Sequence, residues 1–216
     1  MIKIAIFDLD GTLLYTLEDL KNSTNYALEY FSFPKRTIEE VRSFIGNGVM
    51  NLIKRAVPSG ADKDTVQKVY EVFKEHYTIH CNDNTHAFPG IIDMLKELKD
   101  NGIKTGIVSN KNDEAVKRLA DIYFKGLIDI AAGHKEGMEV KPNPDLVNYI
   151  IKESNIDKGA CVYIGDSDVD YYTAKNAGVK SILVSWGFRD KSTLEVLENA
   201  DIIDSVEVLK KRLLGD

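Results

Sequence analysis

Two aspartates near the start of the chain, Asp8 and Asp10, stand two residues apart after an apolar run and before a glycine. Two further aspartates, Asp166 and Asp170, follow another apolar run near the other end. Four bare carboxylates cannot share one site as anions, because like charges raise one another's pKa. A hard divalent cation removes this conflict, and Mg²⁺ suits carboxylates together with phosphate oxygens. The candidate metal ligands are therefore Asp8, Asp10, Asp166 and Asp170.

A positive charge and several hydrogen-bond donors are available for a phosphoryl group. Lys141 stands ahead of a proline, Ser109 follows a third apolar run, and backbone N–H groups follow Asp8. Such groups stabilise the charge that spreads over phosphoryl oxygens during transfer. A carboxylate can attack phosphorus to form an aspartyl-phosphate, and a second carboxylate two residues away can protonate the leaving alcohol and then deprotonate water. Ser109 could also cap a following helix, which is compatible with binding an anion at a helix N-terminus.

The segments that must position these residues alternate between short apolar runs and amphipathic helix patterns. Continuous hydrophobicity is typical of strands buried on both faces of a parallel sheet. The pattern therefore predicts an α/β fold with a doubly wound, Rossmann-like parallel sheet, in which ligands bind at the carboxyl ends of the strands. The expected strands span residues 4–7, 103–108, 127–131, 162–164 and 181–184.

Residues 16–84 interrupt this alternation, because they carry helix patterns and no convincing strand. The stretch is too long for an ordinary crossover between strands. We expect an inserted α-helical domain over residues 16–84 and an α/β core formed by residues 1–15 and 85–216. Thr16, with Asp19 three residues later, could cap the first helix. The expected helices of the insertion span residues 17–31, 38–44, 50–57 and 65–81.

Composition and charge argue against several classes of protein. Of 216 residues, 44% are hydrophobic and 29% are charged, as in ordinary globular proteins. The net charge of −6 argues against a broad electrostatic interaction with nucleic acid. No apolar run reaches the roughly 18–20 residues of a membrane span, and the N-terminus does not resemble a signal peptide. The two cysteines, Cys81 and Cys161, are too far apart for metal-ligand spacing, so we expect a cytoplasmic protein without a disulfide framework.

The candidate residues belong to four motifs: Asp8-Leu9-Asp10-Gly11-Thr12, Ser109-Asn110, Lys141-Pro142 and Gly165-Asp166-Ser167-Asp168-Val169-Asp170. Taken together and in this order, they resemble the motifs of the haloacid dehalogenase superfamily of phosphohydrolases. The resemblance covers the whole chain, and residues 16–84 occupy the place of that family's helical cap domain. It implies a Mg²⁺-dependent phosphatase.

The resemblance also implies a role for each matching position. Asp8 would be the nucleophile and a metal ligand, and Asp10 the general acid and base, with its backbone carbonyl on the metal. Asp166 would bind Mg²⁺, and Asp170 would support the ion directly or through water. The residues that would hold the phosphoryl group are Ser109 and Lys141, with Leu9 and Asn110 contributing backbone groups.

Further segments resemble the phosphoglycolate phosphatase-like branch, namely 44–48, 76–90, 109–111 and 185–188, which implies 2-phosphoglycolate as the substrate. A loop with two glycines lets backbone N–H groups approach a small anion. Candidate substrate contacts from the cap are therefore Gly46, Asn47 and Gly48, and Arg55 is a further candidate for reading a substrate carboxylate. Tyr15 departs from the branch, since many members carry an acid at this position, and we expect it to affect how the cap is oriented and closes.

Two other functions remain open from the sequence. A phosphomutase of the β-phosphoglucomutase type would pass the aspartyl-phosphate to a second substrate. A non-catalytic module would only bind a phosphorylated metabolite, yet such a module needs neither the nucleophile Asp8 nor the acid/base Asp10. The expected partner is a small phosphorylated metabolite rather than nucleic acid or a membrane, and the chain would be a monomer or a homodimer.

Overall fold

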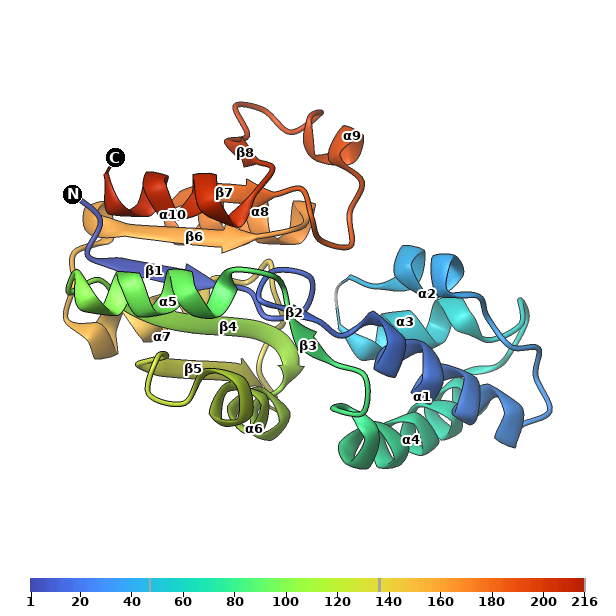
Figure 1. Ribbon diagram of the computed structural model, residues 1–216. Helices are drawn as coiled ribbons and strands as arrows, with labels where there is room; N and C mark the ends of the chain where they lie inside the picture. Colours follow the sequence, from blue (N-terminus) through green and yellow to red (C-terminus); the bar gives the residue numbers. More distant parts are fainter. Residues whose placement is uncertain (47, 136, 216) are drawn as a thin grey trace.

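The computed structural model describes residues 1–46, 48–135 and 137–215, and it places a sheet-based core beside a helical unit (Figure 1). The main sheet has six strands in the order β5-β4-β1-β6-β7-β8, and all neighbouring strands are parallel. The strands are β1 (Ile4–Phe7), β4 (Lys104–Asn112), β5 (Ile130–His134), β6 (Cys161–Gly165), β7 (Lys180–Val184) and β8 (Ile202–Ile203).

Helices cover both faces of this sheet. Successive side chains of a strand point to opposite faces, and in β1 Ala5 and Phe7 join one apolar cluster while Ile4 and Ile6 join another. The first cluster includes side chains of α5, α6 and α10, and the second includes side chains of α7 and α8. The doubly wound α/β prediction is thus confirmed. The helices of the core are α5 (Ile91–Asp100), α6 (Asp113–Phe124), α7 (Asp145–Ser154), α8 (Asp168–Ala177), α9 (Lys191–Leu194) and α10 (Val206–Leu214), with a 3₁₀ turn at Lys158–Ala160.

The central strand β1 lies between β4 and β6, where the order of the strands reverses. The chain builds β4 and β5 on one side of β1 and then crosses to build β6, β7 and β8 on the other. In sheets of this kind, ligands bind in the crevice at the carboxyl ends of the strands beside such a reversal. The motif after β1, the motif in the last part of β4 and the motif that begins at the end of β6 therefore reach the same crevice.

The helical unit packs around an apolar core of its own. Leu28, Ile53 and Phe73, which come from three of its helices, are buried in one shared cluster. It is joined to the sheet-based core by two crossing segments that pair as a short antiparallel ribbon, β2 (Leu14–Tyr15) with β3 (His86–Ala87) (Figure 1). The helices are α1 (Leu17–Tyr30), α2 (Ile38–Phe44), α3 (Val49–Ala56) and α4 (Lys63–His80), each within two residues of the expected range.

The strand expected at residues 127–131 is displaced along the chain. The hydroxyl of Thr105 donates to the carbonyl of Leu127 at 2.6 Å, and its N–H donates to Asp129 at 2.8 Å. With these bonds in place, residues 127–129 form irregular chain outside the sheet, and β5 begins only at Ile130. The next strand inward, β4, continues to Asn112, four residues beyond the expected end. Its last four residues are polar and give no hydrophobic signal, although Ser109 and Lys111 are buried.

The expected side-chain cap at Thr16 is wrong. Thr16 occupies the N-cap position of α1 but makes no capping hydrogen bond. Its hydroxyl instead donates to Oδ1 of Asp10 at 2.6 Å. Asp19 is also used elsewhere, because it accepts hydrogen bonds from Asn84 and Thr85 in the returning segment. Both side chains serve the junction between the two parts of the molecule rather than the helix end.

Candidate active site

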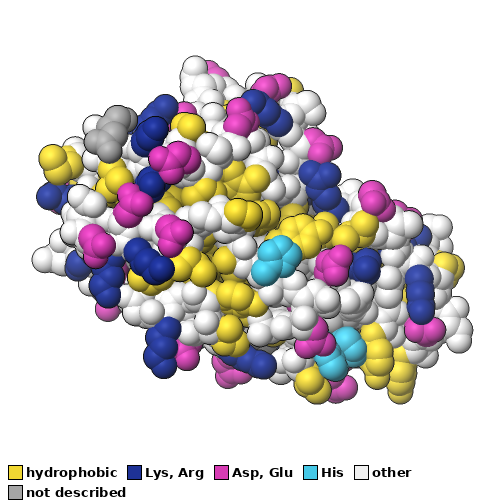
Figure 2. Space-filling model, viewed as in Figure 1, with side chains coloured by type: hydrophobic (Ala, Val, Ile, Leu, Met, Phe, Trp, Pro, Cys, Tyr) yellow, Lys and Arg dark blue, Asp and Glu magenta, His cyan; other side chains and the backbone are white. Residues whose placement is uncertain are grey.

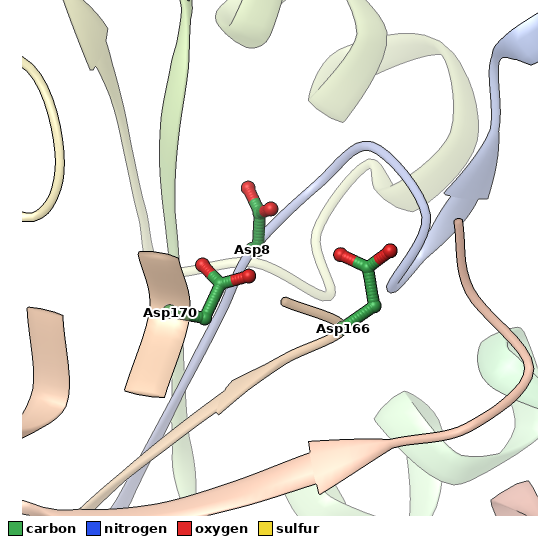
Figure 3. Close-up of side chains that lie close together, drawn as sticks. All are labelled: Asp8, Asp166 and Asp170. Atoms are coloured by element: carbon green, nitrogen blue, oxygen red, sulfur yellow. The ribbon is translucent and has the colours of Figure 1, made fainter. Parts of the chain in front are cut away.

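Three buried aspartates meet at the carboxyl ends of the central strands. Asp8 follows β1, Asp166 follows β6, and Asp170 lies in the first turn of α8. Each offers a carboxylate oxygen, and these oxygens all lie within 4.8 Å of one another (Figure 3). Such a group of oxygen donors fits a divalent cation. Asp10, the fourth expected acid, does not belong to this group by its side chain.

Glycines make room for two of these carboxylates. A Cβ atom on Gly187 would lie 2.2 Å from Cβ of Asp166, and one on Gly165 would lie 2.2 Å from Cγ of Asp170. Contacts this short are not tolerated, so only hydrogen fits at either position. The acids are therefore held against backbone that cannot carry a side chain.

Lys141 lies between two of the acids. Its Nζ atom is 2.9 Å from Oδ1 of Asp8 and 2.7 Å from Oδ1 of Asp170, and the side chain is 4% exposed. The hydroxyl of Tyr163 lies 3.1 Å from the same Nζ atom. Burial alone would lower the pKa of Lys141, but Asp170 and Asp8 raise it well above its ordinary value, so the ammonium group stays charged.

The carboxylates carry more negative charge than one lysine offsets. Burial raises the pKa of Asp8 well above its ordinary value, with Lys141 opposing this and the neighbouring acids adding to it. Burial, followed by the charge of Asp170, raises the pKa of Asp166 to about 7, although the N–H of Phe188 donates to its Oδ2 at 2.6 Å. The site as described therefore lacks positive charge, which a bound cation would supply.

Asp170 already has protein donors on both oxygens. Oδ1 faces Lys141 and accepts from the hydroxyl of Tyr163 at 3.1 Å. Oδ2 accepts from the hydroxyl of Ser167 at 2.5 Å and from the N–H of Ser167 at 3.2 Å. These contacts arise because Ser167 and Asp170 form a capping box at the start of α8. The position of Asp170 is thus determined by the helix terminus and by Lys141.

Ser109 and Asn110 lie within β4 rather than after it. Ser109 is buried at the edge of the site, and its hydroxyl accepts from the N–H of Lys111 at 3.2 Å. It does not cap α6, since the side chain of Asn112 accepts from the N–H of Glu114 and fills that role.

Asn110 and Leu9, both expected to bind the phosphoryl group through their backbone, make different hydrogen bonds. The amide oxygen of Asn110 accepts from the N–H of Lys141 at 2.6 Å, and its amide nitrogen donates to the carbonyl of Lys141 at 3.3 Å. Asn110 therefore places Lys141 through its side chain. The N–H of Leu9 donates to Oδ1 of Asp8 at 2.7 Å, which places a backbone donor beside that carboxylate.

Asp10 is fixed by two donors from different parts of the chain. The Nζ atom of Lys111 lies 2.6 Å from its Oδ1, and the hydroxyl of Thr16 donates to the same oxygen. Lys111 is buried, and the hydroxyl of Tyr77 on α4 lies 2.7 Å from the same Nζ atom. Although burial alone would lower the pKa of Lys111, Asp10 and Tyr77 raise it above its ordinary value. A charged hydrogen-bonded chain thus runs from the helical unit to Asp10.

A cavity of about 100 Å³ lies between the helical unit and the core, beside these groups. Of the three cap residues expected to contact substrate, Gly46 and Gly48 line the cavity, and Asn47 lies outside the described residues. Arg55 does not line the cavity, and its Nη1 atom donates to the carbonyl of Phe44 at 2.6 Å. It supports the loop and is therefore not placed to read a substrate carboxylate.

Tyr15 lies at the junction of the helical unit and the core. Its ring contacts those of Phe88 and Phe188 edge-on, each at a centroid distance of 6.1 Å, and that of His86 at 5.2 Å. Tyr15 therefore takes part in an aromatic cluster at this junction. Asp19, buried in the first turn of α1, links the other side of the junction to Asn84 and Thr85.

The cavity lining includes two cations and a tyrosine that are not among the expected site residues. Lys111, Tyr77 and Arg189 all line it. Lys111 directly follows the Ser109-Asn110 motif, and Arg189 directly follows the segment 185–188, so their places in the sequence offered a signal. Tyr77 lies within a helix pattern of the insertion, where an apolar stripe gives no sign of a polar contact.

The molecular surface carries both signs of charge. On the face shown in Figure 2, acidic and basic side chains are interspersed, and among the described residues neither sign forms an extended patch there. No helix of the described chain has both the length and the apolar character needed to cross a membrane.

Comparisons with known proteins identify similar sequences and structures. A family model described as haloacid dehalogenase-like hydrolase matches residues 5–184. The phosphoglycolate phosphatase of Vibrio vulnificus is 32% identical over 221 residues, covering 96% of this chain and 94% of that protein. The phosphoglycolate phosphatase of Aquifex aeolicus is 31% identical over 188 residues, with 86% of each chain covered. A crystal structure from Lactobacillus delbrueckii subsp. bulgaricus, of a protein proposed to be a phosphoglycolate phosphatase, has a TM-score of 0.94, 37% identity and 99% coverage of both chains.

Proposed function

The chain belongs to the haloacid dehalogenase-like hydrolases and is a phosphoric monoester hydrolase, and we propose that it hydrolyses 2-phosphoglycolate with Mg²⁺ through an aspartyl-phosphate on Asp8. The observation that carries the chemistry is the buried lysine beside the acid group: Lys141 lies 2.9 Å from Asp8 and 2.7 Å from Asp170. This arrangement places a positive charge beside the carboxylate that would attack phosphorus.

The described carboxylates fit a Mg²⁺ ion. Asp8 and Asp166 would hold the ion by their side chains and Asp10 by its backbone carbonyl. Asp170 would act through water, because both of its oxygens already accept hydrogen bonds from the protein. When bound, Mg²⁺ would supply positive charge to the phosphoryl oxygens and to the acids.

Hydrolysis would proceed in two proton-coupled steps. Asp8 attacks phosphorus, the bond from phosphorus to the ester oxygen breaks, and Asp10 gives its proton to the leaving oxygen. Asp10 then takes a proton from water, whose oxygen attacks phosphorus and releases phosphate and free Asp8. The contacts of Lys111 and Thr16 to one oxygen of Asp10 hold it in place for both transfers.

The phosphoryl oxygens would be bound by donors around Asp8. Lys141 supplies the charge, Ser109 a hydroxyl, and Leu9 and Asn110 their backbone N–H groups. Asn110 has a second role in this proposal, because its side chain bonds to both backbone groups of Lys141. Loss of the Asn110 side-chain amide would therefore displace Lys141.

Residues 16–84 would act as a cap over the bound ester, with the α/β core formed by residues 1–15 and 85–216. Gly46 and Gly48 line the cavity from the cap side and would approach the substrate closely. Closure of such a cap excludes bulk water and strengthens the electrostatic contacts beneath it. The small cavity, about 100 Å³, and the names of the relatives support 2-phosphoglycolate as the ester.

The test is phosphate release from a panel of esters with and without Mg²⁺. The panel contains 2-phosphoglycolate, hexose phosphates, nucleoside monophosphates and pyrophosphate, and Asp8→Asn is assayed beside the parent protein. We expect Mg²⁺-dependent release that is greatest for 2-phosphoglycolate and is abolished in Asp8→Asn. The matched control is Asp93→Asn, an exposed aspartate on α5 that does not line the cavity, and it should retain activity.

Each part of the proposal can fail separately. Undiminished release by Asp8→Asn would show that Asp8 is not the nucleophile. A preference for another ester would leave the chemistry standing and replace the substrate. Absence of release from every ester would contradict a phosphatase and favour the phosphomutase or the binding module.

A further inference from the structure

Arg189 brings a third positive charge into the cavity. It lies in the loop after β7, and its side chain is 19% exposed. Lys111 and Lys141, the other cations lining the cavity, each lie within hydrogen-bond distance of an acid that also lines it, Asp10 and Asp8 respectively. The acid beside Arg189 is Asp168, at 3.5 Å, and Asp168 is 44% exposed and does not line the cavity. The charge of Arg189 helps to lower the pKa of Asp166, which lines the cavity, but no hydrogen bond joins these two side chains among the described residues. Arg189 is thus the one cation of the described lining without a hydrogen-bonded acid in that lining.

The guanidinium group retains donors for a ligand. A guanidinium carries five N–H groups. Its Nε atom faces Asp168, and its Nη2 atom donates to the carbonyl of Ile45 at 2.6 Å. The structure gives Arg189 no other hydrogen-bond partner among the described residues, so most of its N–H groups remain available.

The surroundings of Arg189 suit a small ligand with one additional charge. Six apolar side chains line the same cavity: Leu20, Ile45, Val49, Leu52, Val169 and Phe188. An apolar enclosure raises the strength of a contact between opposite charges. It also disfavours a bulky polar group such as a sugar or a base, whose hydroxyl and amide groups would lose hydrogen bonds to water.

We propose that Arg189 binds the carboxylate of the phosphomonoester substrate and thereby selects small esters with a second negative charge. The inference rests on the proposed function, because it needs the phosphoryl group seated beside Asp8. A planar guanidinium can form two parallel hydrogen bonds with a carboxylate. Arg189 would thus be the residue that distinguishes 2-phosphoglycolate from a phosphomonoester of similar size whose organic group carries no charge.

A purely structural role for Arg189 makes a different prediction. The bond to Ile45 fastens the loop of the helical unit to the core, and a Cβ atom on Gly46 would lie 2.6 Å from Nη2 of Arg189. If this fastening were the whole role, removal of Arg189 would impair every ester equally. If Arg189 binds the carboxylate, the loss is confined mainly to esters that carry one.

The experiment compares 2-phosphoglycolate with ethyl phosphate, which lacks the carboxylate, in the parent protein, Arg189→Met and Arg189→Lys. We expect the ratio of kcat/KM for the two esters to fall about 50-fold in Arg189→Met, mainly through KM for 2-phosphoglycolate. Arg189→Lys should restore part of the ratio, because a lysine keeps the charge but not the planar fork. Arg42→Met is the matched control, since Arg42 also joins the helical unit to the core, through Asp190 at 2.9 Å, and does not line the cavity. It should leave the ratio unchanged.

Binding without turnover gives a second readout. In Asp8→Asn protein, the Kd for 2-phosphoglycolate should rise on addition of Arg189→Met, whereas the Kd for inorganic phosphate should change much less. An unchanged ratio of kcat/KM in Arg189→Met, whether neither ester or both esters lose activity equally, would overturn the inference. The proposed function fails on a different result, the absence of Mg²⁺-dependent release from 2-phosphoglycolate by the parent protein.

Discussion

Lys111 of the core and Tyr77 of the helical unit are joined by a buried contact of 2.7 Å between Nζ and the hydroxyl oxygen. The same Nζ atom lies 2.6 Å from Oδ1 of Asp10, the proposed acid and base. Tyr77 therefore reaches Asp10 through one intermediate cation. Because Tyr77 lies on α4, this contact is complete only when the helical unit sits against the core. The position of the helical unit is thus coupled to the charge environment of Asp10.

Tyr77→Phe should lower kcat while KM for 2-phosphoglycolate changes little. The variant removes one hydrogen bond to a buried ammonium group, which is worth about 1.5 kcal/mol, so kcat should fall about 10-fold. Steady-state kinetics at saturating Mg²⁺ measure the effect. Tyr70→Phe, a change of the same kind on the same helix outside the cavity lining, is the control. Equal kcat values for the two variants would contradict a role of Tyr77 in positioning Lys111.

Gly187→Ala should weaken Mg²⁺ binding without altering any charge. The added Cβ atom would lie 2.2 Å from Cβ of Asp166 and must displace that side chain. Displacement of a ligand's support typically costs 10- to 100-fold in metal affinity, so the apparent Kd for Mg²⁺ should rise by about that factor. Activity titrated against Mg²⁺ concentration measures it. In Gly159→Ala the new methyl group meets no atom within 4 Å, and this variant should titrate like the parent protein.

Much of the fold could be predicted because its signals are local. The apolar residues of β1 are fully buried, and continuous hydrophobicity reports such burial directly. Asp8 and Asp166 could be placed together because parallel strands end at the same edge of a sheet. The capping box of Ser167 and Asp170 likewise depends on residues three apart. Strands of two residues, such as β2 and β3, are too short to show periodicity.

The contacts that sequence reasoning missed depend on how the helical unit sits on the core. Tyr77 and Lys111 lie 34 residues apart, and nothing in the apolar stripe of α4 indicates a lysine opposite the hydroxyl. Arg55 and Arg189 also show that the sequence does not reveal which side chains tertiary packing brings to the cavity. Arg55 follows the predicted cap loop and Arg189 follows the segment 185–188, but only tertiary packing turns Arg55 toward the carbonyl of Phe44 and places Arg189 in the cavity lining.

Asp19→Asn should lower the free energy of unfolding, although Asp19 does not line the active-site cavity. The Asp19 carboxylate is buried and accepts from two backbone N–H groups, one amide and one hydroxyl, all in Asn84 and Thr85. Replacing one oxygen with an NH₂ group sets a donor against a donor, which should lower the free energy of unfolding by about 2–3 kcal/mol. Urea denaturation measures it. Glu18→Gln, the same change at the neighbouring and less buried position, should cost well under 1 kcal/mol, and a similar loss in both variants would contradict the role of Asp19.

Mg²⁺ should stabilise the protein more strongly as the pH rises. Without metal, burial and the charge of Asp170 raise the pKa of Asp166 to about 7 in the folded state, so the folded protein binds a proton that the unfolded chain releases near pH 4. By this group the metal-free protein is therefore most stable below about pH 4, and it loses roughly 1 kcal/mol per pH unit between about pH 4 and pH 7, with no further loss above that range. Mg²⁺ competes with that proton, so the gain in Tm on adding Mg²⁺ should grow between about pH 5 and pH 8. Thermal melts with Mg²⁺ or a chelator measure it, and Asp166→Asn should show a smaller pH dependence. A gain that is the same at every pH would mean that the acid group does not bind the ion.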